Sequence, residues 1–136
     1  MIKELIMGII LALICANPQI KNPVDSEERE LLAQVMYWEN YWNGEEAMLL
    51  TGSVVLNRRD HCSWCPDTIK EVLYQKGQYS TTKYFYTKDL PDNVYKLSEQ
   101  LLRYGSIAPD NVIFQAMSPQ GSGIYKKVGT DYFCYE

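Results

Sequence analysis

The sequence predicts an α+β fold in which helices come first and a small antiparallel sheet closes the chain. Apolar residues recur at helical spacing between residues 25 and 104, and they alternate with polar residues beyond residue 112. Helices followed by a run of strands are typical of α+β domains. The 136 residues allow a single domain. We place this domain at residues 25–136, after a short lead-in at residues 17–24.

The first predicted helix begins at Asp25, which together with Glu28 forms an acid-x-x-Glu capping pattern. Four apolar residues share one face of this helix: Leu31, Leu32, Val35 and Met36. Glu39 continues the same face one turn beyond Val35. A carboxyl group placed there is desolvated, and desolvation raises its pKa toward the range in which a general acid works. The alternative is an exposed Glu at a fraying helix end.

Gly44 separates this helix from a second one, predicted from about residue 45 to residue 59. Gly52 and Ser53 would let another backbone come close, so we expect this helix to be central. Its predicted inward residues are Ala47, Leu50, Thr51, Val54 and Val55. The two acids that begin it, Glu45 and Glu46, are explained mainly by the helix dipole.

A third, shorter helix is predicted with Asp67 as its cap and Gly77 as its stop. Its inward residues are Ile69, Val72 and Leu73. Residues 78–88 are rich in Tyr, Thr and Ser and predict a loop or irregular strands that line a polar cleft. A fourth helix is predicted at residues 91–104, with these buried residues: Val94, Leu97, Leu101 and Leu102.

Beyond the helices, residues 112–116 predict one strand, and residues 124–128 and 132–135 predict a hairpin around Gly129 and Thr130. The N-terminus resembles a targeting segment rather than part of the domain. Lys3 precedes an apolar run at residues 5–16, which predicts a signal peptide cleaved after Ala16. The alternatives are a lipoprotein modified at Cys15, where Ile14 is larger than expected, and a retained helix.

Three cysteines remain after the signal peptide: Cys62, Cys65 and Cys134. In an exported protein we expect a bridge from Cys62 to Cys65, or from either of them to Cys134, with one thiol left over. A zinc site that adds His61 is a weaker alternative, because adjacent His61 and Cys62 do not easily reach one ion. A thioredoxin-like motif would need a βαβ unit, and none is visible in the sequence.

Net charge excludes one class of function. The chain carries a formal net charge of -4 and has no basic run. Binding to nucleic acid phosphates requires clustered Lys and Arg, so we expect no nucleic acid partner. For the same reason we expect no attraction to a membrane surface.

Several ordered blocks of the sequence resemble the SleB-like cell-wall hydrolases, the family of spore cortex-lytic enzymes. Residues 37–46 (YWENYWNGEE) lead without a gap into residues 51–58 (TGSVVLNR), and Glu39 falls on the catalytic Glu of that family. Three further blocks are similar to family segments: residues 66–72 (PDTIKEV), 77–80 (GQYS) and 128–133 (VGTDYF). The resemblance covers nearly all of the chain after residue 27.

The sequence departs from the family pattern around Glu39. Trp38 stands where the family usually has Gly, and residues 41–44 (YWNG) replace its Arg-Gly-Glu-Pro run. The added aromatic rings suit sugar binding, because pyranose faces are apolar and stack on rings, and they equally suit a core.

The resemblance implies a lysozyme-like fold with a glycan-binding cleft between the helical core and the sheet. It implies peptidoglycan glycan strands as the partner and a lytic transglycosylase activity in which Glu39 is both acid and base, with a 1,6-anhydro product and no metal or cofactor. We expect these residues to bind the glycan: Gln78, Tyr79, Ser80, Trp42, Phe114 and Gln115. Glu46 falls on an acidic position of the family pattern and is assigned a supporting role.

We expect a monomer exported to the cell wall or spore envelope, or encoded by a phage and acting on its host's wall. Two other functions stay open. Trp38 in place of Gly favours a peptidoglycan-binding module without activity, and the Cys62/Cys65 pair favours an envelope thiol oxidoreductase.

Overall fold

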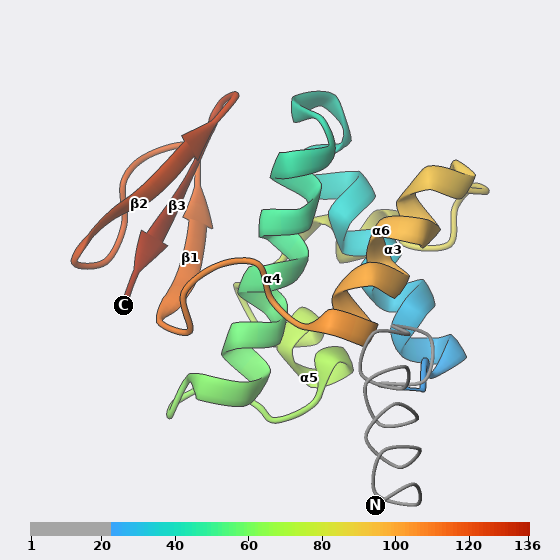
Figure 1. Ribbon diagram of the computed structural model, residues 1–136, viewed down its shortest axis with the longest axis horizontal. Helices are drawn as coiled ribbons and strands as arrows, with labels where there is room; N and C mark the ends of the chain where they lie inside the picture. Colours follow the sequence, from blue (N-terminus) through green and yellow to red (C-terminus); the bar gives the residue numbers. More distant parts are fainter. Residues whose placement is uncertain (1–22) are drawn as a thin grey trace, which may run out of the picture.

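The structure, a computed structural model, describes residues 23–136 and consists in that range of helices followed by one antiparallel sheet (Figure 1). The α-helices are α3 (Ser26–Asn40), α4 (Glu45–His61), α5 (Ile69–Tyr74) and α6 (Asp92–Tyr104). Two 3₁₀ turns are η1 (Tyr41–Asn43) and η2 (Ser80–Tyr84). The strands are β1 (Val112–Ala116), β2 (Gly123–Val128) and β3 (Asp131–Tyr135), in the order β1-β3-β2.

The predicted α+β fold class is confirmed. The predicted signal peptide at residues 1–16, and all of the lead-in except its last two residues, lie outside the described part of the chain. Within residues 23–136, none of the helices has the length and apolar character needed to cross a lipid bilayer.

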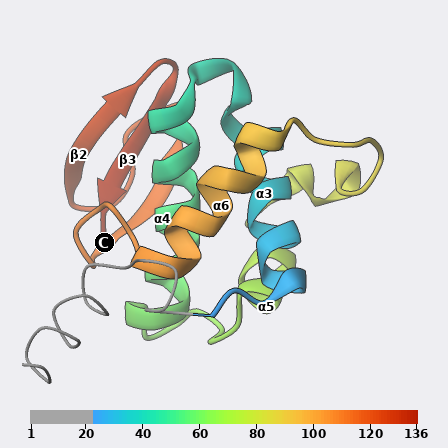
Figure 2. The ribbon, with the colours of Figure 1, turned by 45° about the vertical axis from the view of Figure 1, so that its right-hand side comes forward.

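Helix α4 lies between the sheet and the other helices, as both ribbon views show (Figures 1 and 2). One side of α4 places Leu50 and Val54 against Val112 and Phe133 of the sheet. Another side places Met48, Val55 and Leu56 in the larger cluster shared with the other helices. Because α4 is buried on two sides, its apolar residues do not form a single stripe. The predicted central position of this helix is confirmed.

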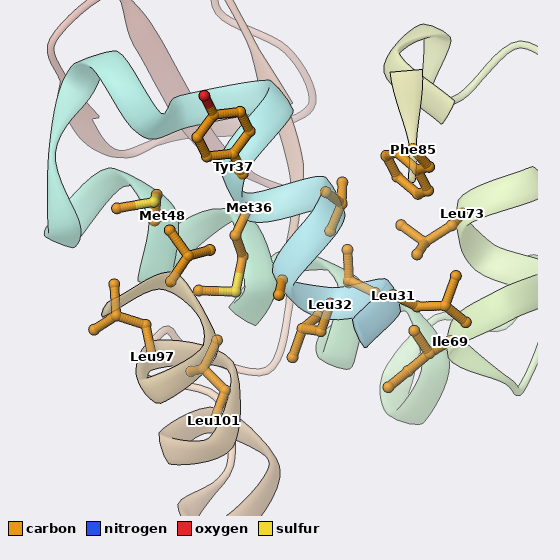
Figure 3. Packing of buried hydrophobic residues seen from close by; sticks show 14 of the residues in the cluster. Leu31, Leu32, Met36, Tyr37, Met48, Ile69, Leu73, Phe85, Leu97 and Leu101 are labelled. Atoms are coloured by element: carbon orange, nitrogen blue, oxygen red, sulfur yellow. The ribbon is translucent and has the colours of Figure 1, made fainter. Parts of the chain in front are cut away.

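The larger core fills the space between α3, α4, α5 and α6 (Figure 3). Leu32 and Met36 of α3 are fully buried and lie close to Leu101 of α6. A side chain at Gly52 of α4 would overlap Leu101 and crowd Met36. Gly52 therefore allows three helices to meet closely, through side chains rather than through backbone contact. All of the inward residues predicted for the first three helices are buried.

The predicted helix caps are confirmed at α3 and corrected at α5. The Asp25 side chain accepts a hydrogen bond of 2.9 Å from the backbone N–H of Glu28. At α5 the cap is Thr68 rather than Asp67, because Thr68 has the extended backbone of an N-cap and its hydroxyl accepts from the Glu71 N–H at 3.1 Å. Both residues are good caps by type, so sequence could not separate them.

Two segments contain 3₁₀ turns. Residues 78–88 form a loop, which is one of the two predicted alternatives, and this loop contains the turn η2 and no strand. The turn η1 follows α3 directly and was not predicted. Short 3₁₀ turns have no hydrophobic period of their own, so the sequence gives no signal for them. Both turns position residues around Glu39.

Cys62 and Cys65 form a disulfide, which is one of the pairings expected from the sequence. Cys134 is a buried free thiol on β3. The disulfide follows the C-terminus of α4, where Cys62 is the C-cap residue. It therefore lacks the position at a helix N-terminus that lowers a thiol pKa in redox motifs.

Candidate active site

Glu39 lies in the last turn of α3, half-buried between the helical core and the sheet. Burial raises the pKa of Glu39, and the nearby negative charge of Asp131 raises it further. A hydrogen bond from Thr81 acts in the opposite direction, because it stabilises the carboxylate and lowers the pKa. The net pKa is above the ordinary value, so the direction expected from the sequence is confirmed. Such a carboxyl group stays protonated to a higher pH than an ordinary Glu, so it can donate a proton to a bound substrate.

Two hollows adjoin Glu39. The larger has a volume of about 320 Å³ and lies where the end of α3 and η1 face the ends of β1 and β3. Its lining consists of Glu39, Trp42, Asn43, Gln115, Ala116, Met117, Thr130 and Asp131. The smaller has a volume of about 130 Å³ and is lined by Glu39, Arg58, Gln78, Tyr79, Ser80 and Gln115. Since Glu39 and Gln115 line both, the two hollows form adjoining parts of one polar cleft.

Asp131 is a second carboxylate in this cleft, and sequence reasoning missed it. It begins β3, it is 7% exposed, and it shares the larger hollow with Glu39. Its Oδ2 accepts hydrogen bonds from Asn40 at 3.0 Å and from Gln115 at 3.3 Å. The only sequence signal for Asp131 was its place in the block of residues 128–133. Asp131 and Glu39 are far apart along the chain, so the sequence did not show that they lie close together.

Asn40 is the last residue of α3 and holds Asp131 in its place in the cleft. Its side-chain amide donates to Thr51 of α4 at 2.7 Å as well as to Asp131, and all three residues are buried. Its carbonyl oxygen accepts from Asn43 at 2.8 Å. Buried polar groups that are fully paired in this way hold one arrangement, because every broken contact leaves a desolvated group behind.

The turn between β2 and β3 is tied to the same place. Asn43 donates to the Thr130 hydroxyl at 3.1 Å and accepts from the Thr130 N–H at 3.4 Å. Gly129 has a backbone φ of +58°, and a side chain there would overlap Asn43. Only glycine fits both the left-handed backbone and the close approach. These contacts place Asp131 beside the end of α3.

The structure brings five of the predicted binding residues to this cleft: Trp42, Gln78, Tyr79, Ser80 and Gln115. Trp42 is 84% exposed and forms one wall of the larger hollow. Gln78 and Ser80 are exposed at the edge of the smaller hollow, and Gln115 lines both hollows.

Tyr79 was expected at the cleft edge rather than in the core, and the exclusion from the core is wrong. The side chain is 9% exposed and belongs to the larger hydrophobic core, although it also lines the smaller hollow. Its neighbours Gln78 and Ser80 turn outward, so the ring of Tyr79 points inward. A hydroxyl-rich loop gave no sign of this alternation.

Two other predicted residues line neither hollow. Phe114 precedes Gln115 on β1, and neighbouring side chains of a strand point to opposite faces. The Phe114 ring instead stacks with Trp64, with centroids 6.2 Å apart. Glu46 is exposed at the start of α4 and forms an ion pair with Lys126 of β2. Glu46 therefore connects the helix to the sheet, away from both hollows.

Trp38, the departure from the family pattern, also lies outside the lining of both hollows. Its indole N–H donates to Gln34 at 3.1 Å, and its ring lies 5.2 Å from that of Tyr84. The large ring in place of Gly therefore packs against η2 and leaves the space beside Glu39 open.

Arg58 is a further residue of the cleft that the sequence did not single out. It is 5% exposed, near the end of α4, and it lines the smaller hollow. Sequence placed it in the block of residues 51–58 without a role. Among residues 23–136, no three His, Cys, Asp or Glu side chains gather in a way that could hold a metal ion.

Comparison with known families decides the class of protein. Residues 42–127 match the family model described as cell wall hydrolase, which covers more than half of the chain. The chain belongs to the cell wall hydrolase family. No curated protein and no solved structure matches the chain.

Membership in the cell wall hydrolase family makes this protein a peptidoglycan-degrading enzyme. The family includes the SleB catalytic domains, and the observed α+β fold is consistent with a lysozyme-like domain of this family. The matched segment contains the edge of the smaller hollow and strand β1. Glu39 lies just before that segment and Asp131 just after it, so the family match does not include either residue.

Proposed function

We propose that this cell wall hydrolase is a SleB-like lytic transglycosylase that cuts the bond between N-acetylmuramic acid and N-acetylglucosamine. The observation that carries the proposal is the position of Glu39, a carboxyl group with a raised pKa at the junction of two hollows. A sugar bound on each side of Glu39 would bring the glycosidic oxygen next to this acid.

The first step uses Glu39 as an acid. The protonated carboxyl group donates its proton to the glycosidic oxygen, the bond from that oxygen to C1 of the muramic ring breaks, and positive charge develops on the ring. The buried carboxylate of Asp131 in the same hollow stabilises that charge electrostatically. Asp131 is already held by Asn40 and Gln115, so it does not have to reorganise during the reaction.

The second step uses Glu39 as a base. Its carboxylate removes the proton from the C6 hydroxyl of the same muramic ring, and the C6 oxygen attacks C1. The product is a 1,6-anhydro sugar, and Glu39 regains its proton. The Thr81 hydroxyl, 2.8 Å from Oε1, stabilises Glu39 during the interval in which it is charged.

Asp131 favours a second candidate reaction, which is hydrolysis by two carboxylates. Glycosidases of that kind hold their carboxyl groups about 5 to 9.5 Å apart and use the second as nucleophile or base. However, Asp131 is buried, and its Oδ2 already accepts from two amide groups. An oxygen that is occupied in this way is a poor base for water, so we favour the transglycosylase.

The remaining cleft residues are proposed to bind the glycan. Gln78 and Ser80 supply polar groups at the edge of the smaller hollow. Trp42 offers an exposed ring for stacking against the apolar face of a sugar, and Gln115 adds polar contacts between the hollows.

Mass spectrometry of the products from purified sacculi tests the proposal. A transglycosylase releases muropeptides that end in anhydromuramic acid and are lighter by one water than hydrolytic products. Reducing muramic ends instead of anhydro ends would assign the reaction to the two-carboxylate hydrolase. If the folded protein releases no muropeptides, the result would favour the alternative function, a peptidoglycan-binding module without activity.

We further propose that the protein is exported as a monomer, after removal of residues 1–16, to the cell wall, the spore envelope or the wall of a phage host. The motive is the apolar run that follows Lys3, together with a substrate that lies outside the cytoplasm. N-terminal sequencing of secreted protein should give a chain that begins at Asn17. A secreted chain that still begins at Met1 would contradict the cleavage.

A further inference from the structure

Arg58 places a buried positive charge beside Glu39. Its Nε donates to the backbone carbonyl of Ile113 at 2.7 Å, and its Nη1 donates to the side-chain oxygen of Gln78 at 2.8 Å. The guanidinium carbon lies 5.5 Å from the ring centroid of Tyr79 and 5.7 Å from that of Trp64. These neighbours fix the orientation of the guanidinium in the wall of the smaller hollow.

None of these partners carries a negative charge. Within residues 23–136, Arg58 forms no salt bridge, whereas its neighbour Arg59 contacts both Asp60 and Glu28. A side chain that is only 5% exposed loses most of its hydration, and buried charges are normally paired. Arg58 therefore lacks the anion that a structural role alone would provide.

Two other side chains of the same hollow have unused polar atoms. The Tyr79 hydroxyl and the Gln115 side-chain oxygen are buried and have no hydrogen-bond partner in the described chain. Burial raises the pKa of Tyr79 to about 12, so the hydroxyl keeps its proton and can donate it to an acceptor. A fixed cation, a free donor and a free acceptor thus line one hollow of about 130 Å³.

We propose that this smaller hollow is a subsite for a carboxylate of the muramic acid residue whose bond is cut. The guanidinium of Arg58 and the hydroxyl of Tyr79 would donate to the carboxylate, and Gln115 would accept from an amide N–H of the substrate. The inference rests on the proposed function. Peptidoglycan offers carboxylates of two sources at this ring: the lactyl group itself, when no peptide is attached, and the peptide stem that the lactyl group carries.

Geometry and charge agree with this occupant. The lactyl group and the scissile bond belong to the same sugar ring, and Glu39 and Arg58 line the same hollow. Glu39 is neutral before the first step, so it does not repel an incoming anion. The volume is sufficient for a carboxylate with a few attached atoms, because a water molecule occupies about 30 Å³.

Two matched pairs of substrates test the inference on the unmodified protein. The first pair is glycan strands without peptides, used as free lactyl acids or as lactyl methylamides. The second pair is peptide-bearing strands with free or amidated stem carboxylates. We expect amidation to lower kcat/KM by about tenfold or more in one pair, because hydrogen bonds to charged groups are strong. The pair that responds identifies the source of the carboxylate.

Variants connect the preference to the hollow. Arg58→Gln should abolish the difference within the responding pair, whereas the control Arg59→Gln should keep it. Tyr79→Phe removes a buried hydroxyl that has no partner, so it should fold like the unmodified protein. Tyr79→Phe should still reduce the preference for the free carboxylate over the amide several-fold.

Binding of the same four strands to Glu39→Gln is measured in parallel, so that the test does not depend on turnover. Equal cleavage and equal binding within both pairs would overturn the carboxylate subsite and leave the proposed function intact. A retained binding preference without cleavage of any strand by the unmodified protein would support the subsite and overturn the proposed function.

Discussion

Thr81 donates a hydrogen bond of 2.8 Å to Oε1 of Glu39, although the two residues are 42 positions apart in the chain. Thr81 belongs to the turn η2 and Glu39 to the end of α3. The bond favours the ionised carboxyl group and opposes the effect of burial, which favours the neutral acid. Thr81 therefore adjusts the pH range over which Glu39 keeps its proton.

Replacing Thr81 with Val should shift the pH profile of cleavage. The substitution removes the contact that lowers the pKa of Glu39, so the pKa rises further and the alkaline limb of kcat/KM moves to higher pH. The matched control is Thr87→Val, which removes a hydroxyl bonded to the Tyr84 carbonyl in the same segment. An alkaline limb at the same pH in Thr81→Val and in the unmodified protein would contradict the assignment of that limb to Glu39.

Asp131→Asn should shift the same limb in the opposite direction. The charge of Asp131 raises the pKa of Glu39, so its removal lowers that pKa and moves the alkaline limb to lower pH. The amide oxygen can still accept from Asn40 and Gln115, but without the charge both hydrogen bonds are weaker, which should cost about 1 to 3 kcal/mol of stability in thermal melts. Under the proposed mechanism the variant is slower, because the stabilising charge is gone, but its product is still an anhydro sugar. Reducing muramic ends in place of anhydro ends would refute it.

The fold and the acid on α3 were predictable because each depends on local pattern. Leu31, Leu32 and Met36 mark one helix face, and Glu39 continues it. The alternation of residues 112–116 and 132–135 likewise predicted two of the strands, with the last beginning one residue later than β3 does. These signals need only the spacing of apolar residues along a short segment.

The rest of the site depends on contacts between distant segments, which a single sequence does not display. Asp131 reaches the cleft only because Asn40 and Asn43 hold the turn at Gly129. Arg58 is buried because β1 covers it, and its position in a helix gave no sign of that. Tyr79 turned inward between two exposed neighbours for the same kind of reason.

Truncation of Gln78 and of Tyr79 should have different consequences. Gln78→Ala removes a side chain at the cleft edge whose oxygen accepts a hydrogen bond from Arg58, so KM should rise by several-fold and stability should fall by about 1 kcal/mol. Tyr79→Ala removes a core ring and should cost about 3 to 5 kcal/mol of stability. Melts and kinetics on soluble glycan measure both. A large loss of stability in Gln78→Ala would identify it as scaffold.

Glu39→Gln should be more stable than the unmodified protein at neutral pH, and this advantage should disappear at acidic pH. The folded state raises the pKa of Glu39 above its unfolded value of about 4.3, so the stability of the protonated form is lost as pH rises through the raised pKa. Glutamine does not ionise and escapes this loss. Thermal melts on either side of the pKa measure the difference.

The control for that experiment is Glu45→Gln. Glu45 is exposed in the first turn of α4, where its charge is favourable, so its replacement should cost about 0.3 to 1 kcal/mol at neutral pH. The two variants are thus expected to differ in sign. A loss of stability at neutral pH in Glu39→Gln would show that its ionised form is the favoured one in the folded protein.

Muropeptide release from purified sacculi by Glu39→Gln, compared with the unmodified protein, tests the central claim most directly. The amide keeps the shape of the side chain and cannot donate or accept the catalytic proton. We predict that the unmodified protein releases anhydro muropeptides and that folded Glu39→Gln releases them at least about 10²-fold more slowly. Release by Glu39→Gln at a rate close to that of the unmodified protein would contradict the claim that Glu39 is the acid.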